Sequence, residues 1–359
     1  MKVATIVGTR PEIIRLSRVL AVLDQCTEHT LIHTGQNYDY ELNQIFFEEL
    51  EIRIPDVFLE AAGKTAAETI SQVIAKSDAA LRVVKPDALL VLGDTNSCLA
   101  AISAKRLKIP VFHMEAGNRC FDQRVPEEIN RKIVDHISDI NMPYSTISRD
   151  YLIREGFSPD RVIKTGSPMF EVINHYRSKI DNSSILNKLS LKKDSYYVVS
   201  VHREENVDDP ERFERFLTVL DNLSKENQRI IVSTHPRTRK RLEAVGMQRK
   251  PGIEFHKPFG FIDYVNLQIN ARTVLSDSGT ITEEASILCF SALNMRDAHE
   301  RPEGMEEAAV MMVGMSWPRI QEGLNIIRLT GKKERVPNII VEDYNVPNVS
   351  EKVVKIILS

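Results

Sequence analysis

The stretch Asp277-Ser278-Gly279-Thr280-Ile281-Thr282-Glu283-Glu284 decides the fold. It follows the apolar run 273–275, which predicts a buried strand, and leads into residues 281–288, which predict a helix. A strand that turns through Ser-Gly-Thr into a helix leaves unpaired backbone N–H groups at a positive dipole end, where an anion can bind. Glu284, about one turn into the helix, would repel a phosphate and suits a neutral diol such as a ribose. An ordinary helix capped by the Asp and the Ser is the alternative.

The same strand-turn-helix pattern extends over most of the chain. Predicted strands cover residues 3–7, 30–33, 88–92, 111–114 and 162–165, and then 196–201, 230–233, 273–275, 290–294 and 310–313. Predicted helices cover residues 12–23, 41–50, 66–84, 97–106, 127–137, 211–224, 237–244, 262–270, 281–288 and 349–358. This alternation predicts parallel sheets wrapped by helices, the α/β class.

The length of 359 residues favours two domains over one. The polar segment 181–194 is weakly patterned and follows a predicted helix near residues 169–179, so the join falls there. We therefore predict two doubly wound α/β domains, 1–168 and 169–340, that face a cleft. The last helix, within residues 341–359, is expected to pack back on the first domain.

Composition excludes several classes of protein. Hydrophobic residues make up 42% and charged residues 27%, an ordinary soluble balance, and the net charge of −3 provides no basic field for nucleic acid or anionic membrane. No apolar run approaches the ~20 residues of a membrane span, and the N-terminus lacks a signal-peptide pattern. The four cysteines are scattered without a CxxC pair, which favours reduced thiols in a cytoplasmic enzyme.

Polar motifs come directly after the predicted strands. They occupy residues 8–12, 34–37, 93–96, 115–118, 202–206, 235–237 and 277–279. Ligands of open parallel sheets bind at the carboxyl ends of the strands, so both halves are expected to direct their chemistry into one crevice.

Three carboxylates in these motifs are candidates for acid/base chemistry: Asp94, Glu115 and Glu127. Brought together, they would repel one another and raise the pKa of at least one, which makes a carboxyl usable as a proton donor or base. Arg131 follows Glu127 by four residues on the same helix face. The alternatives are a surface salt bridge for that pair and a helix cap for Asp94.

Basic side chains in the same motifs are candidates for binding an anion. Arg10 and Arg15 follow the first strand, and Arg301 beside Pro302 would offer a bidentate fork to a diphosphate. His202 can act on a proton or hold a phosphate oxygen. A solvated helix face for Arg15 and a capped loop for His202 are the alternatives. No GxGxxG, Walker or HExxH pattern occurs, which disfavours dinucleotide, ATP and metal sites.

Taken together and in this order, the motifs resemble the non-hydrolysing UDP-N-acetylglucosamine 2-epimerase family. The resemblance rests on Gly8-Thr9-Arg10-Pro11-Glu12, Gly93-Asp94-Thr95, Glu115-Ala116-Gly117, Pro126-Glu127-Glu128-Ile129-Asn130-Arg131, His202-Arg203-Glu204, Asp277-Ser278-Gly279 with Glu283-Glu284, and Glu300-Arg301-Pro302-Glu303. It implies two Rossmann-like domains in the GT-B arrangement, a homodimer, and neither NAD nor a catalytic metal.

The resemblance also implies a reaction and residue roles. UDP is eliminated from a UDP-2-acetamido sugar and adds back after a proton reaches the other face of C2. By motif, Asp94, Glu115 and Glu127 are acid/base candidates, while Arg131 and His202 bind phosphates or polarise the reacting centre. The diphosphate would be held by Arg10, Arg301 and the amides of Ser278, Gly279 and Thr280. Glu284 would hold the ribose, and Tyr264 would contact the uracil.

Departures from the family pattern point to a particular branch. Gln36-Asn37-Tyr38-Asp39-Tyr40 replaces the usual Gln-His-Arg-Glu-Met, which puts activation by substrate in doubt, and Arg15 replaces a lysine. These and nearby motifs are similar to the capsule and O-antigen branch, which forms UDP-N-acetyl-L-fucosamine. Phe121, Phe259 and Phe261 could line a site for its 6-deoxy sugar, or could be simple core. UDP-ManNAc formation from UDP-N-acetylglucosamine, a GT-B glycosyltransferase and a non-catalytic nucleotide-sugar sensor are the rival functions.

Overall fold

The computed structural model describes residues 1–35, 44–246, 250–297, 301–330 and 341–359. The chain forms two units, the first made of Met1–His175 with Glu342–Ser359 and the second of Tyr176–Val341. The first unit thus extends beyond residue 168, and the C-terminal segment belongs to it. None of the described helices has the length and apolar character of a membrane span.

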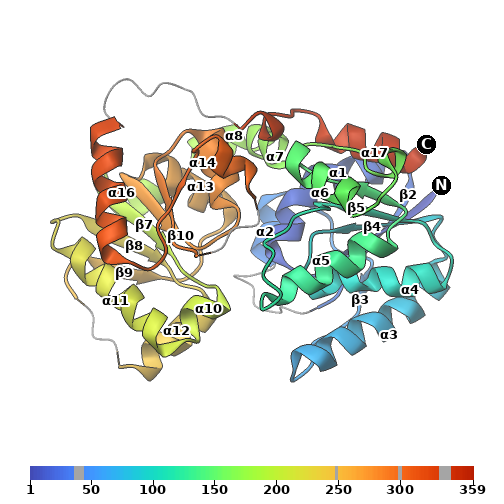
Figure 1. Cartoon of the computed structure of the whole chain (residues 1–359), viewed down its shortest axis with the longest axis horizontal. Helices are drawn as coiled ribbons and strands as arrows, with labels where there is room; N and C mark the ends of the chain where they lie inside the picture. The colour runs from blue at the N-terminus through green and yellow to red at the C-terminus, as the bar shows by residue number, and fades with distance from the viewer. Residues whose placement is uncertain (36–43, 247–249, 298–300, 331–340) are drawn as a thin grey trace. The chain divides into compact units, whose positions relative to one another are not determined.

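The first unit contains a six-stranded parallel sheet in the order β3-β2-β1-β4-β5-β6 (Figure 1). Its strands are β1 Lys2–Val7, β2 Glu28–His33, β3 Val57–Phe58, β4 Ala88–Leu92, β5 Val111–Met114 and β6 Ile140–Met142. Its helices are α1 Arg10–Cys26, α2 Gln44–Glu49, α3 Ala66–Val84, α4 Ala100–Arg106, α5 Pro126–Ile137, α6 Thr146–Arg154, α7 Met169–His175 and α17 Val349–Leu358, with short 3-10 turns at Asn96–Leu99, Pro159–Arg161 and Glu342–Tyr344.

The second unit repeats this arrangement, with six parallel strands in the order β12-β11-β10-β7-β8-β9. Its strands are β7 Tyr196–Ser200, β8 Arg229–Ser233, β9 Ile253–His256, β10 Thr273–Ser276, β11 Ala292–Asn294 and β12 Met311–Met312. Its helices are α8 Arg177–Asp181, α9 Ile185–Lys188, α10 Glu204–Val207, α11 Pro210–Ser224, α12 Pro236–Ala244, α13 Phe261–Asn270, α14 Ile281–Leu288, α15 Glu303–Glu306 and α16 Trp317–Thr330.

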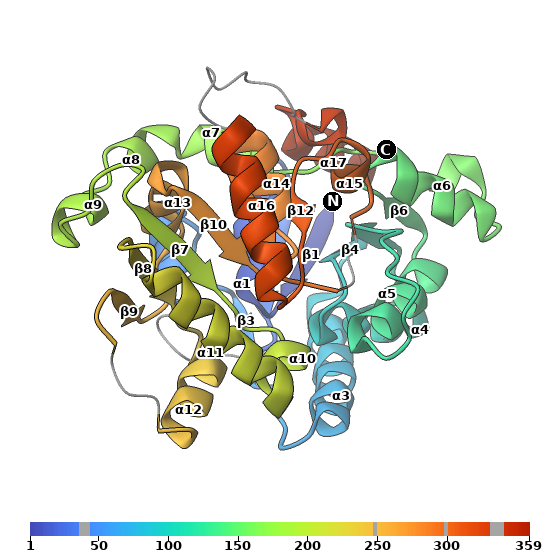
Figure 2. The ribbon, with the colours of Figure 1, turned by 60° about the vertical axis from the view of Figure 1, so that its left-hand side comes forward.

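Successive residues of a strand point to opposite faces of its sheet. Both faces of each sheet are buried, so alternate residues of one strand belong to different cores. In β7, Tyr197 and Val199 belong to a core shared with α11 and α16, whereas Tyr196 and Val198 belong to a core shared with α13 and α14. Figure 2 shows α11 and α16 side by side over one face of the second sheet. In the first unit α3, α4 and α5 cover one face, and α1, which contacts β1, β2 and α17, lies on the other. The predicted doubly wound α/β class is confirmed.

Two local expectations differ from the structure, and a third falls partly outside the described residues. The strand predicted at residues 162–165 is wrong, because Val162 makes one isolated bridge to Asn141 and the sixth strand is β6 instead. The helix predicted near residues 169–179 is interrupted at Tyr176 between α7 and α8. The helix predicted at 41–50 is observed as α2, and residues 41–43 lie outside the described part of the chain.

Candidate functional site

The candidate residues follow strands at the topological switch point of each sheet. In the first unit the chain reverses its direction of strand addition between β1 and β4, which pair directly. In the second unit the corresponding neighbours are β7 and β10. Loops at the carboxyl ends of two such strands diverge to opposite faces and leave room for a ligand. Each unit is described by itself below.

Asp94, in the turn after β4, is held by the helix α5. Oδ2 of Asp94 accepts hydrogen bonds from Nε and Nη2 of Arg131 at 3.0 and 2.5 Å, and the Asp94 carbonyl accepts one from Asn130 Nδ2 at 2.9 Å. Arg131 is 1% exposed. The structure therefore places a buried guanidinium directly against Asp94.

Glu115, directly after β5, is paired with Arg15 of α1. Arg15 Nη1 donates to Oε2 of Glu115, and Asn118 Nδ2 lies 3.3 Å from Oε1. Arg15 is 3% exposed, with its guanidinium 5.8 Å from the ring centroid of Tyr144, so the solvated alternative for this residue is wrong. Glu115 has a φ of 61°, a left-handed backbone that non-glycine residues adopt at a cost of about 1–3 kcal/mol.

Glu127 and Glu128 have different environments in the first turn of α5. Glu127 is half-buried and makes no hydrogen bond or ion pair within the described residues, so it does not pair with Arg131. Glu128 is fully buried, lies 2.8 Å from Arg131 Nη1 and accepts from the amides of Cys120 and Phe121 at 3.1 and 3.3 Å. Burial acts to raise the pKa of Glu128, but the Cys120 amide and Arg131 lower it overall. Its i,i+3 spacing to Arg131 was the signal that could have identified it.

Glu12 is a second buried carboxylate that the sequence analysis did not single out. It accepts hydrogen bonds from the amides of Gly8 and Thr9 at 3.0 and 2.7 Å, from the Thr9 hydroxyl at 2.7 Å, and from Ser97. Burial raises its pKa against the effect of these donors. Thr9 and Glu12 form a capping box at the start of α1, a pattern visible in the sequence. Through Ser97, Glu12 ties the loop after β1 to the segment after β4.

In the second unit, His202 is held by the buried Asp277. The Asp277 carboxylate accepts from the amides of His202 and Arg203 at 3.1 and 2.9 Å and from Asn206 Nδ2 at 3.1 Å, and Oδ1 lies 3.0 Å from His202 Nδ1. Burial acts to raise the pKa of Asp277, but His202 and the donors lower it to about 2. Asp277 thus secures the loop after β7 through its side chain, and the cap alternative does not describe it.

The Ser-Gly-Thr turn lies between β10 and α14, as predicted. The amides of Ser278 and Thr280 donate to the hydroxyls of Ser276 and Ser278 at 3.0 and 3.3 Å. Arg301 is 6% exposed, and its Nη1 donates to the Gly279 carbonyl at 2.6 Å while its Nε lies 3.5 Å from the buried Glu283. Arg301 is therefore positioned at the turn where an anion was predicted.

The remaining predicted contacts of a nucleotide lie on α14, α13 and α1. Glu284 is 8% exposed and accepts from Gln268 Nε2 at 2.7 Å. Tyr264 on α13 is half-buried against the core shared by α13 and α14. Arg10, in the first unit, opens α1 with its guanidinium 5.7 Å from the ring centroid of Phe46. Residues 36–40 and 300, which carried part of the family pattern, lie outside the described part of the chain.

The three phenylalanines proposed as apolar lining differ in exposure. Phe121 is 69% exposed and packs edge-on against Tyr151, with ring centroids 5.2 Å apart. Phe261 is 4% exposed as the first residue of α13, where its ring packs near Tyr176. Phe259 is half-buried beside His256. Phe261 is therefore buried in the core, in line with the alternative, whereas Phe121 is exposed, and the lining role stays a prediction.

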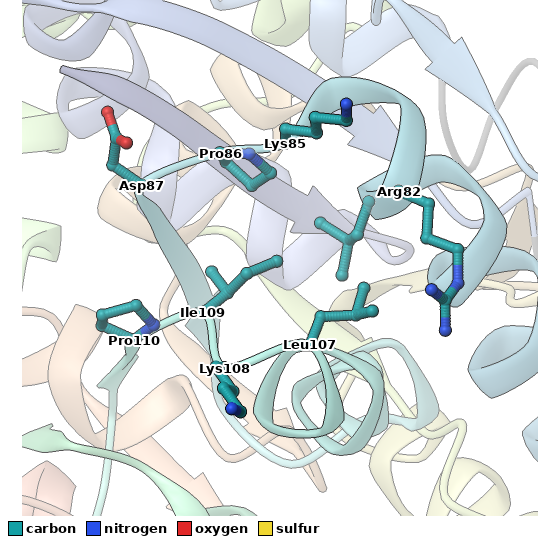
Figure 3. A pocket seen from close by; sticks show the side chains of 9 residues that line it. Arg82, Lys85, Pro86, Asp87, Leu107, Lys108, Ile109 and Pro110 are labelled. Carbon is teal, nitrogen blue, oxygen red and sulfur yellow. The ribbon is translucent and has the colours of Figure 1, made fainter.

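A cavity of about 590 Å³ lies at the opposite end of the first sheet (Figure 3). Its lining comes from the end of α3 and from the turns before β4 and β5, including Arg82, Asp87 and Lys108. Asp94 and Glu115 follow the other ends of these two parallel strands, so the cavity is separate from the candidate site.

Comparison with known proteins agrees with this geometry. The family model described as UDP-N-acetylglucosamine 2-epimerase matches residues 22–358. The chain is similar to a UDP-N-acetylglucosamine 2-epimerase structure from Rickettsia bellii, with 49% identity, a TM-score of 0.91 and coverage of 100% of this chain and 96% of that one. It is also similar to the Methanocaldococcus jannaschii UDP-GlcNAc 2-epimerase in complex with UDP-GlcNAc and UDP, with 32% identity, a TM-score of 0.93 and coverage of 100% and 99%.

A further relative is the UDP-2,3-diacetamido-2,3-dideoxy-D-glucuronate 2-epimerase of Pseudomonas aeruginosa, 32% identical over 90% of this chain and 91% of that protein. The matches thus include proteins named for different UDP-sugars. The fold, the order of the motifs and the match over nearly the whole chain lead to one conclusion: this protein belongs to the UDP-N-acetylglucosamine 2-epimerase family.

Proposed function

We propose that this protein inverts C2 of a UDP-linked 2-acetamido sugar, with Asp94, Glu115 and Glu127 as the acid/base groups. The observation that carries the proposal is the pairing of Asp94 with Arg131 and of Glu115 with Arg15 after neighbouring strands. A guanidinium beside a carboxylate favours its ionised form, which a group that removes a proton needs. Glu127 makes no side-chain hydrogen bond or ion pair among the described residues and is the third acid/base group of the proposal.

The proposed reaction has two balanced steps. A carboxylate removes the C2 proton while the bond from C1 to the UDP oxygen breaks. The products of this step are a 2-acetamidoglycal with a C1–C2 double bond and UDP, both still bound to the protein. A carboxyl then delivers a proton to the opposite face of C2, and the UDP oxygen bonds again to C1. UDP must stay bound between the steps, so the site needs a strong diphosphate clamp.

The second unit supplies that clamp in this proposal. Arg301 and the amides of the Ser278-Gly279-Thr280 turn hold the diphosphate. The Ser276 and Ser278 hydroxyls, which now accept from the amides of Ser278 and Thr280, give way to phosphate oxygens. His202, oriented by Asp277, binds a phosphate oxygen. Glu284 binds the ribose, and Tyr264 flanks the uracil.

We propose UDP-2-acetamido-2,6-dideoxy-L-talose as the substrate and UDP-N-acetyl-L-fucosamine as the product, for surface polysaccharide synthesis. The exposed ring of Phe121, whose backbone amide donates to Glu128, supports an apolar contact for a 6-methyl group. UDP-N-acetylglucosamine is the second candidate substrate, and the Methanocaldococcus jannaschii relative bound to that sugar favours it.

Proton NMR in D2O tests the reaction and the sugar together. The purified protein is incubated with UDP-N-acetyl-L-fucosamine in one tube and UDP-N-acetylglucosamine in another, and the C2 proton signal is followed. Loss of the signal in the first tube alone is expected. Exchange confined to the second would keep the reaction and replace the substrate, and no exchange in either, with UDP bound, would favour a transferase or a sensor.

Amide variants identify the acid/base groups. Asp94→Asn, Glu115→Gln and Glu127→Gln are each expected to slow exchange by about 100-fold or more while UDP affinity is retained. Asp160→Asn, a change of an exposed carboxylate in the same unit, is the matched control and should exchange at the wild-type rate. Full activity in all three site variants would refute the assignment.

We also propose that the protein is a homodimer, as the family resemblance implies. The molar mass in solution, measured by light scattering during size-exclusion chromatography, tests this directly. The chain has a mass of 40.8 kDa, so a monomer and a dimer are well separated.

A further inference from the structure

Four ionisable side chains of the first unit are linked to one another by hydrogen bonds and ion pairs, and three of them are fully buried. Asp135 on α5 lies 2.9 Å from His113 Nδ1 on β5 and 2.7 Å from Arg119 Nη1, and Arg119 donates through Nε and Nη2 to Glu155 at 2.8 and 2.6 Å. The side chains of His113, Asp135 and Arg119 are fully buried, while Glu155 is 29% exposed. We refer to these four residues as the His113 cluster.

Both ring nitrogens of His113 face acceptors. Nε2 lies 2.8 Å from the carbonyl oxygen of Gly93, and Nδ1 lies beside the Asp135 carboxylate. A neutral imidazole carries one N–H and one lone pair, so either tautomer would set a lone pair against an oxygen. Nδ1 lies at ion-pair distance from Asp135, and a carboxylate so close favours the doubly protonated imidazolium. Burial acts to lower the pKa of His113, but Asp135 and the Gly93 carbonyl raise it overall.

The His113 cluster holds backbone on both sides of the candidate carboxylates. Gly93, which precedes Asp94, has a φ of 72° and is tied to His113 through its carbonyl. Gly117, two residues after Glu115, donates its amide to Asp135 at 3.2 Å. A cluster of fixed charge thus anchors the turn of one carboxylate and the loop of the other.

The anchoring continues to the Glu115 carboxylate itself. Arg119 Nη1 donates to the carbonyl of Asn118 at 2.7 Å, and the Asn118 side chain lies 3.3 Å from Glu115 Oε1. A methyl group at Gly93 would lie 3.7 Å from Glu115 Oε2, so this carboxylate is in contact range of the Asp94 turn. A shift of either loop would therefore change the separation of the two carboxylates.

Stability alone does not explain the cluster. Buried ion pairs pay a desolvation cost that largely offsets their attraction, and well-packed apolar residues of similar size often serve folding equally well or better. Charged side chains add hydrogen bonds and ion pairs to specific partner atoms, and these fix the orientation of the groups involved. Here those hydrogen bonds lead to Gly93, Gly117 and Asn118, each next to or within two residues of the loops that carry the acid/base groups.

We propose that His113, as an imidazolium, together with Asp135 and Arg119 forms a set of positioning residues that fixes the geometry of Asp94 and Glu115 during catalysis. The proposal rests on the proposed epimerase function for its kinetic consequence. None of the three touches the reacting atoms. Their removal lowers kcat, because proton transfer depends steeply on placement, and leaves the nucleotide-binding residues of the second unit unchanged.

The charge state of His113 can be measured without any turnover. Protein labelled with ¹⁵N-histidine is titrated by NMR, with the ordinary histidine value as the reference. One ring is expected to keep both nitrogens protonated to a higher pH than an ordinary histidine, and His113→Gln identifies it by loss of that signal. A His113 ring that loses its proton at or below the ordinary value would overturn the proposal.

The positioning role is measured through kcat and KM. Asp135→Asn and His113→Gln are expected to lower kcat by about 10- to 100-fold with KM and UDP affinity within about 2-fold of wild type. Arg119→Lys should retain more activity than Arg119→Met because it keeps the charge. Val134→Ala, a fully buried neighbour on α5, is the matched control, which loses stability through a cavity but keeps its kcat.

The outcomes separate this proposal from the function it rests on. Absence of C2 exchange in the wild-type protein would refute the epimerase function, whatever the NMR of His113 shows. Exchange in the wild type with an unchanged kcat in folded Asp135→Asn would refute the positioning role alone. If Val134→Ala, at the same loss of stability, lowered kcat as much as the cluster variants do, the positioning role would also be refuted.

Discussion

Arg131 places Nε and Nη2 on the same oxygen of Asp94, at 3.0 and 2.5 Å, while its Nη1 lies 2.8 Å from Glu128. One buried guanidinium therefore compensates two carboxylates, one in the turn after β4 and the other on its own helix. Arg131 is 1% exposed and Glu128 is fully buried, so neither charge can be solvated when its partner is lost. Arg131 therefore contributes to the stability of the fold in addition to its proposed role in the reaction.

Replacement of Arg131 by Met should destabilise the protein strongly. Asp94 and Glu128 would both lose this guanidinium, while Lys132 would remain 3.5 Å from Glu128, and breaking such a buried pair costs about 3–5 kcal/mol. Urea unfolding measures the loss. Arg161→Met is the matched control, because Arg161 is 59% exposed and lies 3.5 Å from Asp160, and it should change stability little. An Arg131→Met variant within about 1 kcal/mol of wild type would contradict this account.

Asp277→Asn should lower stability at neutral pH and lose that effect in acid. The pKa of Asp277 is lowered from 3.8 to about 2, so its stabilisation is present above pH 3.8 and is lost as pH falls toward 2. The shift corresponds to about 2 kcal/mol at neutral pH. Unfolding of wild type and variant is compared from pH 7 to the lowest pH at which both fold, and a difference that grows in acid would contradict the sign.

His33 should make the protein less stable below neutral pH. Burial lowers the pKa of His33 to about 4, and the Gly35 amide donates to its Nδ1 at 2.9 Å, which fits the neutral ring. The unfolded chain takes up a proton near pH 6.5 and the folded protein does not, so stability falls as pH drops from 6.5 toward 4.

The contribution of His33 amounts to about 2 kcal/mol between pH 6.5 and pH 5. His33→Gln keeps an acceptor for the Gly35 amide and should lack this component. The measurement is the difference in unfolding free energy between wild type and variant at pH 7 and pH 5. Identical pH dependence in the two proteins would show that His33 is not buried in its neutral form.

Glu12→Gln and Glu12→Ala should have very different effects. Gln retains an oxygen for the amides of Gly8 and Thr9, whereas Ala leaves these donors unpaired at a cost of about 2 kcal/mol. Because burial raises the pKa of Glu12, the folded protein holds its proton more tightly and wild-type stability declines as pH rises above 4.5. Glu12→Gln should therefore compare more favourably with wild type at pH 7 than at pH 4.5, and equal losses in the two variants would contradict the hydrogen-bonding role.

The central strands of both sheets and the edge strand β12 were predictable from local patterns, whereas the other edge strands were not. The strands Ala88–Leu92 and Val111–Met114 and the helices Ala66–Val84 and Ile281–Leu288 agree with expectation residue for residue, because long apolar or periodic runs determine them. The edge strands β3, β6 and β9 were missed. They contain two to four residues, too few for a periodic signal, and they pair with a neighbour along one side.

The sequence by itself determined which chemical groups stand at the ends of the strands, since Asp94 and Glu115 follow apolar runs that could form buried strands and little else. Only the tertiary structure decided their partners. Arg15 lies 100 residues from Glu115 and Arg131 lies 37 from Asp94, and the closer candidate, Glu127 with Arg131, does not pair. The attraction between two charges depends on the distance between them in space and on the low polarity of their surroundings. That distance is set by how the helices α1 and α5 pack, and not by the separation of the residues along the chain.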